Sequence, residues 1–118
     1  MERYQNAVGK WMLACFSDEI TSDILERNHR FLEEALELVQ SLECTKSEAH
    51  QLVDYVFNRP VGEPKQELGG VMVTLAALSN TWGMQMELEG LEELKRIWKR
   101  IPEIRAKQAA KPKYSPLP

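Results

Sequence analysis

Four glutamates in this sequence are spaced so that they could bind a divalent metal ion. Glu33, Glu34 and Glu37 lie in a stretch of helical periodicity, and at about 100° per residue they fall within one arc of roughly 100°. Glu67 opens a second helical stretch further along the chain. Carboxylate oxygens suit Mg²⁺, which often shares its coordination with substrate phosphates. The first three glutamates also lie opposite the apolar arc of their helix, which is the pattern of a solvated face.

Glu67 stands at the head of the longest uncharged segment of the chain, which we expect to form the most buried helix. Residues 68–86 carry no charged side chain, and Gly70, Thr74 and Ala77 form a line of small residues on the same helical stripe as Glu67. A carboxylate beside such a line is costly to bury unless it is paired, metal-bound or hydrated. Alternatively, Glu67 simply occupies the first turn, where the helix dipole favours a negative side chain. The sequence leaves both interpretations open.

The charge distribution divides the chain into an acidic body and a basic end. The 118 residues carry a net charge of −3, yet residues 95–118 contain one acidic side chain, Glu103, against eight lysines and arginines. This end is either a solvated helix face or a binding surface for anions. Binding to nucleic acid is disfavoured, because the acidic body would repel a phosphate backbone. The length predicts a single helical domain over residues 1–110, followed by a Pro/Lys-rich tail over residues 111–118.

The remaining composition favours a soluble protein of the cytoplasm. Cys15 and Cys44 have neither a metal-binding spacing nor the pattern of a disulfide framework, so we expect reduced thiols. The residues after Met1 do not resemble a signal peptide. The apolar run 71–78 is too short to span a bilayer, so no membrane partner is expected.

Apolar periodicity predicts helices throughout and no convincing strand. The sequence therefore predicts an all-α bundle of about five helices. Thr45-Lys46-Ser47-Glu48 matches a capping box, Gly83 is suited to a helix C-terminus, and Pro102 must kink or restart the last helix. The expected helices cover residues 3–16, 22–42, 46–58, 64–82 and 87–100, with a continuation over 103–110.

The two glutamate-containing stretches resemble a known family. Glu33-Glu34-Ala35-Leu36-Glu37, followed by Gln66-Glu67-Leu68-Gly69-Gly70-Val71, is similar to the motifs of the all-α NTP pyrophosphohydrolases, the MazG-like group. Their pattern is Glu-Glu-x-x-Glu, a spacer, and Glu-x-x-Asp. The resemblance implies a helical homodimer or homotetramer. It also implies hydrolysis of a nucleoside triphosphate to the monophosphate and pyrophosphate, with Mg²⁺, or Mn²⁺ in its place, as cofactor.

The resemblance also implies a role for individual residues. Glu34, Glu37 and Glu67 match metal ligands, while Glu33 matches the remaining motif glutamate, which binds metal through water or helps to activate the attacking water. The basic end matches a helix that contacts the phosphates, through Arg105, Lys107 and Lys111. Trp11 resembles a residue of the nucleotide pocket, although its spacing with Val8 and Cys15 favours a core residue.

The sequence departs from the family pattern at two positions. Gly70 stands where the motif has its aspartate, and Gln85 stands where many members have an acidic residue. Losing the aspartate removes one oxygen ligand and one negative charge. Either Glu63, one turn before Glu67, supplies a substitute carboxylate, or the chain is a catalytically impaired module that binds a nucleotide or a protein partner.

Overall fold

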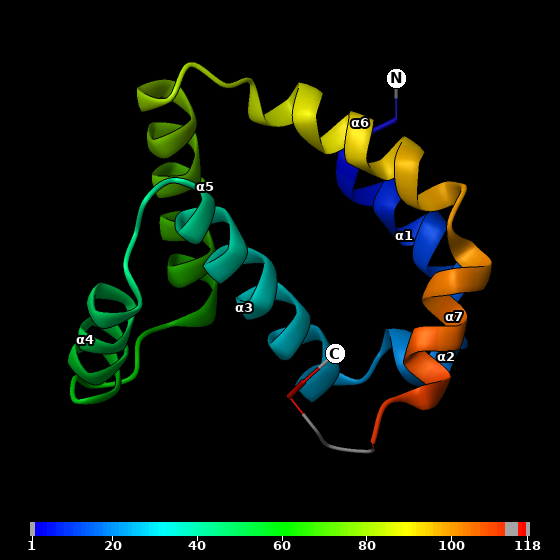
Figure 1. Cartoon of the computed structure of the whole chain (residues 1–118), viewed down its shortest axis with the longest axis horizontal. Coiled ribbons are helices and arrows are strands. Elements are labelled where there is room, and N and C mark those ends of the chain that lie inside the picture. The colour runs from blue at the N-terminus through cyan, green and yellow to red at the C-terminus, as the bar shows by residue number, and fades with distance from the viewer. Residues whose placement is uncertain (1, 113–115, 118) are drawn as a thin grey trace. The chain divides into compact units, whose positions relative to one another are not determined.

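The computed structural model describes residues 2–112 and 116–117, and this part of the chain is all-helical, without a strand (Figure 1). The all-α prediction is confirmed. The described residues form seven helices rather than about five, because a short helix precedes the second predicted one and a new helix begins beside Pro102. Residues 1, 113–115 and 118, which include part of the predicted tail, lie outside the described residues. The helices are α1 (Tyr4–Cys15), α2 (Asp18–Thr21), α3 (Ile24–Ser41), α4 (Lys46–Phe57), α5 (Pro64–Thr81), α6 (Met86–Trp98) and α7 (Ile101–Ala110).

Local sequence signals set several of the helix ends. Thr45 accepts a hydrogen bond from the Glu48 backbone N–H, and the Glu48 side chain accepts one from the Thr45 N–H, so the predicted capping box is confirmed. These bonds also lower the pKa of Glu48, because they favour its ionised form. Gly83 has a φ of +67°, and the Met84 N–H bonds to the Ser79 carbonyl, which is the Schellman arrangement at the end of α5.

The residue after α3 adopts the same left-handed conformation without being a glycine. Glu43 has a φ of +76°, and the Cys44 N–H donates to the Val39 carbonyl over 2.9 Å. A left-handed conformation costs an L-residue roughly 1–2 kcal/mol. Glu43→Gly is therefore expected to raise the free energy of unfolding by about 0.5–1 kcal/mol, because the strain relieved exceeds the added backbone entropy of glycine.

Urea denaturation measures this change. Gly83 provides the opposite test, because it is a glycine in the same left-handed conformation. Gly83→Ala should lower the free energy of unfolding by about 1 kcal/mol, because it places a Cβ in the left-handed region. An unchanged or lowered stability for Glu43→Gly would show that the Glu43 side chain contributes more than its backbone costs.

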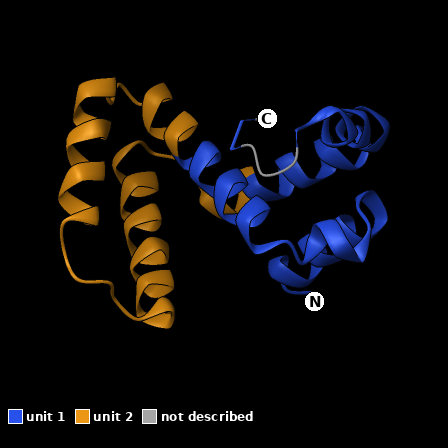
Figure 2. Ribbon diagram, turned by 90° about the horizontal axis from the view of Figure 1, so that it is seen from below, with its two compact units in different colours: residues 1–35, 90–118 blue, residues 36–89 orange. Residues whose placement is uncertain are grey.

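The described chain divides into two compact units (Figure 2). Unit 1 contains residues 1–35 and 90–118, and unit 2 contains residues 36–89. Helix α3 begins in unit 1 and ends in unit 2, whereas α6 begins in unit 2 and continues into unit 1. The prediction of one domain over residues 1–110 stays a prediction.

Unit 1 is held together by contacts between α1 and the pair α6 and α7, beside which α1 lies (Figure 1). The Tyr4 hydroxyl donates to the Gly90 carbonyl over 2.9 Å, and a Cβ at Gly90 would lie 3.0 Å from the Tyr4 ring. A Cβ at position 90 would therefore force the end of the Tyr4 side chain to move by a few tenths of an ångström. Burial raises the pKa of Tyr4, with a further contribution from the negative charge of Glu93. Cys15 and Leu94 are the buried apolar residues of this unit among those described.

Unit 2 leaves most of its apolar side chains exposed. We expected α5 to be the most deeply buried helix, but Ser79 is its one buried residue, and Leu68 is 65% exposed. In α4, no residue is buried and Phe57 is 84% exposed. The expectation for α5 was wrong because no segment of unit 2 covers these helices. An uncharged helix that is apolar on several faces normally lies inside a larger assembly.

Two predictions about the cellular setting are addressed only in part. Cys15 and Cys44 are free thiols, and burial raises the pKa of Cys15, an effect opposed by the charge of Arg105. Among the described residues, no helix is long and apolar enough to cross a membrane. A cytoplasmic location stays a prediction.

Candidate functional site

The three clustered glutamates lie on α3, in the second half of that helix. Glu33 is partly buried and accepts a hydrogen bond from Arg30 Nη1 over 2.7 Å. Glu34 and Glu37 are exposed. Glu33 and Glu34 belong to unit 1 and line a pocket there, whereas Glu37 belongs to unit 2.

The second motif lies at the start of α5, in unit 2. Glu63 is the N-cap residue, although its side chain caps no backbone N–H, and Glu67 is exposed in the first turn. The Glu67 carboxylate folds back over Gly62, where an added Cβ would lie 3.0 Å from Oε2. Gly70 has no atom within 4 Å of the position of an added Cβ, so the site of the missing aspartate is open. Within the described residues, no three His, Cys, Asp or Glu side chains are grouped so as to hold a metal ion.

A pocket of about 510 Å³ in unit 1 brings glutamates and cations together. Pockets of this size commonly bind small molecules and cofactors. Its walls come from α1, residues 26–34 of α3, α6, α7 and single residues that follow α1, α6 and α7. Its charged lining comprises Glu26, Glu33, Glu34, Glu93 and Glu103, with Arg27, Arg30, Arg96, Arg100, Lys107 and Lys111.

The cations of the pocket differ in how firmly they are paired. Arg96 forms a forked pair with Glu93, with nitrogen–oxygen distances of 2.8 and 2.6 Å. This hydrogen bonding lowers the pKa of Glu93 and raises that of Arg96. Arg100 and Lys107 form no hydrogen bond or close ion pair with a residue that the structure describes, although the charge of Arg100 helps to lower the pKa of Glu93, so they can bind an anionic ligand without breaking a hydrogen bond.

The three basic residues expected to contact phosphates have different surroundings. Lys107 lines the pocket. Arg105 donates to the Cys15 and Ala14 carbonyls over 2.8 and 2.6 Å, and thereby caps the C-terminus of α1. Lys111 also lines the pocket, but its side chain is only 7% exposed and its Nζ lies 2.5 Å from Glu26 Oε1. Phosphate binding by these three residues stays a prediction.

Trp11 lies on the pocket wall and also takes part in packing. Its Nε1 donates to the Ile97 carbonyl over 3.3 Å, and its ring meets Phe16 edge-on at 5.6 Å. These contacts agree with the core interpretation of its spacing. The ring nevertheless borders the pocket, so a role beside a nucleotide stays a prediction.

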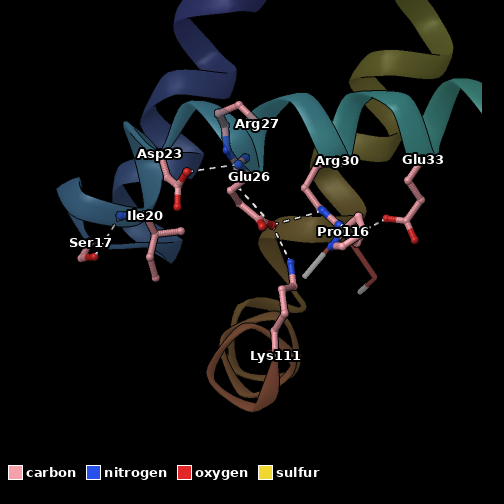
Figure 3. Close-up of polar contacts among 9 residues, drawn as sticks. All are labelled: Ser17, Ile20, Asp23, Glu26, Arg27, Arg30, Glu33, Lys111 and Pro116. Atoms are coloured by element: carbon pink, nitrogen blue, oxygen red, sulfur yellow. Dashed lines mark hydrogen bonds and ion pairs between the residues drawn. The ribbon is translucent and has the colours of Figure 1, made fainter. Parts of the chain in front are cut away.

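Sequence reasoning missed a buried charge cluster at the edge of the pocket (Figure 3). Glu26 is buried, and its Oε1 lies 2.5 Å from Lys111 Nζ, 3.1 Å from Arg30 Nε and 3.9 Å from Arg27 Nη2. The angle at Arg30 Nε does not suit a hydrogen bond, so that contact is an ion pair. The i,i+4 spacing of Glu26 and Arg30 could have indicated their pairing. The contact with Lys111 could not, because it joins distant parts of the sequence.

Comparison of the chain with protein-family models, with curated proteins and with solved structures gave no match. The family assignment therefore depends on the sequence motifs alone and stays a prediction.

Proposed function

We propose that the protein is a Mg²⁺-dependent nucleoside triphosphate pyrophosphohydrolase of the MazG-like kind. The observation that carries this proposal is the pocket in unit 1. Glu33 and Glu34 line this pocket together with six arginine and lysine side chains. Carboxylates suit Mg²⁺, and lysines and arginines suit phosphate oxygens. A pocket with both is the combination that a metal–triphosphate complex requires.

Each residue then has a defined task. Glu34, Glu37 and Glu67 are the proposed ligands of Mg²⁺ or Mn²⁺, with Glu63 as the substitute for the missing aspartate. The ion would neutralise the triphosphate and acidify a bound water. Glu33 would accept the proton of the attacking water, whose oxygen bonds to one of the two phosphorus atoms as the anhydride bond between the α- and β-phosphates breaks, so that nucleoside monophosphate and pyrophosphate leave. Arg100 and Lys107, which form no hydrogen bond with a described residue, would hold the phosphates.

The test is pyrophosphate release from a panel of NTPs and dNTPs, with and without Mg²⁺. We expect release from at least one nucleotide, dependent on the metal and strongly reduced in Glu37→Gln. No metal-dependent release from any nucleotide at micromolar protein would refute the proposal.

A homodimer or homotetramer is part of the same proposal. The exposed apolar side chains of α4 and α5 within unit 2 support it, because a second copy of the chain would remove them from water. Light scattering at micromolar concentration measures the mass in solution. A monomer under these conditions would contradict an assembly of this kind.

The open space around Gly70 allows the missing aspartate to be restored. Gly70→Asp is expected to lower the Mg²⁺ concentration for half-maximal activity on the order of 10-fold, because an added carboxylate raises the ligand charge. Gly69→Asp is the matched control, since its Cβ also meets no atom within 4 Å but points about 100° away around α5. Metal titrations of hydrolysis compare the two. Equal responses would show that added charge, rather than position 70, causes the effect.

The second candidate function is a module that binds a nucleotide or a protein partner without hydrolysing anything. The glycine at position 70 favours it, because that position supplies no carboxylate. Calorimetric binding of a nucleotide by a chain that releases no pyrophosphate would establish this alternative.

A further inference from the structure

The guanidinium group of Arg30 has a partner at each of its three nitrogens (Figure 3). Its Nε lies 3.1 Å from Glu26 Oε1, its Nη1 donates to Glu33 Oε1 over 2.7 Å, and its Nη2 donates to the Pro116 carbonyl over 2.5 Å. The side chain is 20% exposed, so water screens these contacts only in part. Arg30 therefore joins a buried carboxylate, the segment after α7 and the proposed catalytic carboxylate.

Glu26, the buried partner of Arg30, is itself held in place. Its carboxylate is buried and contacts the equally buried Lys111, and its backbone N–H donates to Asp23 Oδ1 over 3.2 Å. Lys111 holds the Glu26 carboxylate, the Asp23 bond holds the Glu26 backbone, and a buried side chain with such a partner loses most of its rotamer freedom. The orientation of Arg30 is thus set at Glu26 and passed on to Glu33, one turn further along α3.

We propose that Arg30 is the positioning residue of the reaction and that it fixes the Glu33 carboxylate in the orientation needed to accept the proton of the attacking water. This inference rests on the proposed function, which assigns that proton to Glu33. The planar guanidinium directs its two hydrogen bonds to Glu33 and the Pro116 carbonyl in fixed directions while its charge pairs with Glu26, whereas an ammonium group is a point charge on a flexible stem. Arginine is therefore required at this position, not merely a positive charge.

The experiment compares steady-state hydrolysis by the full chain and by Arg30→Lys. We expect kcat to fall about 10- to 100-fold, because misplacing a reacting group by 1 Å can cost about 10²-fold. KM should stay within twofold of the starting value, since Arg30 acts through Glu33 and not on the substrate. Arg59→Lys is the control, because Arg59 lies over the Tyr55 ring in unit 2 and does not line the pocket. Its activity should be unchanged.

A second variant separates positioning from a general loss of structure. Arg30→Ala removes the fork, and added guanidinium ions should restore part of its kcat while leaving the unsubstituted protein unaffected. A wild-type kcat in Arg30→Lys, or a change in KM alone, would overturn the positioning role while leaving the proposed function intact. Absence of pyrophosphate release by the unsubstituted chain would overturn both.

Discussion

Replacing Glu33 by glutamine is expected to lower kcat for pyrophosphate release by about 10²–10⁴-fold, the usual contribution of a general base. Glutamine keeps the length of the side chain and an oxygen that accepts the Arg30 hydrogen bond now made by Oε1. It cannot take a proton from water. Steady-state kinetics at saturating Mg²⁺ measure the loss.

Two other glutamate-to-glutamine substitutions serve as comparisons for Glu33→Gln. Glu34→Gln, which removes a proposed metal ligand, should raise the Mg²⁺ requirement at least roughly 10-fold, because even indirect partners of metal ligands contribute about 10–100-fold to affinity. Glu92→Gln, on the exposed face of α6, should change neither quantity. Equal kcat values for Glu33→Gln and the starting protein would remove Glu33 from the chemistry.

The second large effect is on stability. Glu26→Ala is expected to lower the free energy of unfolding by about 3–5 kcal/mol, because it leaves Lys111 buried without its counter-ion. The side chains of Glu26 and Lys111 are only 8% and 7% exposed, so water cannot replace the lost partner. Urea denaturation followed by circular dichroism measures the change.

Surface and apolar replacements serve as controls for this prediction. Glu92→Ala breaks the exposed contact with Lys95 at 3.5 Å and should cost no more than about 0.5 kcal/mol. Glu26→Leu combined with Lys111→Met should recover part of the loss, since replacing a buried pair by apolar groups is often neutral, while Arg30 still loses its contact with Glu26. A loss from Glu26→Ala no larger than that from Glu92→Ala would show that water reaches the pair.

Helix ends that depend on near neighbours could be predicted from the sequence. The Thr45–Glu48 box and the glycine at position 83 act within a few residues, so their sequence pattern determines their geometry. Glu43 escaped prediction because its left-handed φ occurs without the glycine that usually signals it. Helix α2 was missed because four residues are too few for a periodic pattern.

The candidate site was predictable only in its composition. Glu33, Glu34 and Lys107 line one pocket, but their roles stay predictions. The contacts of Arg105 with the end of α1 and of Lys111 with Glu26 depend on tertiary packing between segments about 85–90 positions apart. Periodicity contains no information on such pairs. For the same reason, it could not show that α5 would be left uncovered.

The composition of unit 1 has a consequence for the order of folding. Residues 1–35 and 90–118 build it together, so its pocket requires both ends of a chain that emerges from the ribosome from the first residue onward. During synthesis, the segment 36–89 can form its helices before residues 90–118 are available to pack against α1. Closing such a long loop is entropically costly and slows folding. A product that terminates before Lys111 therefore has no complete pocket.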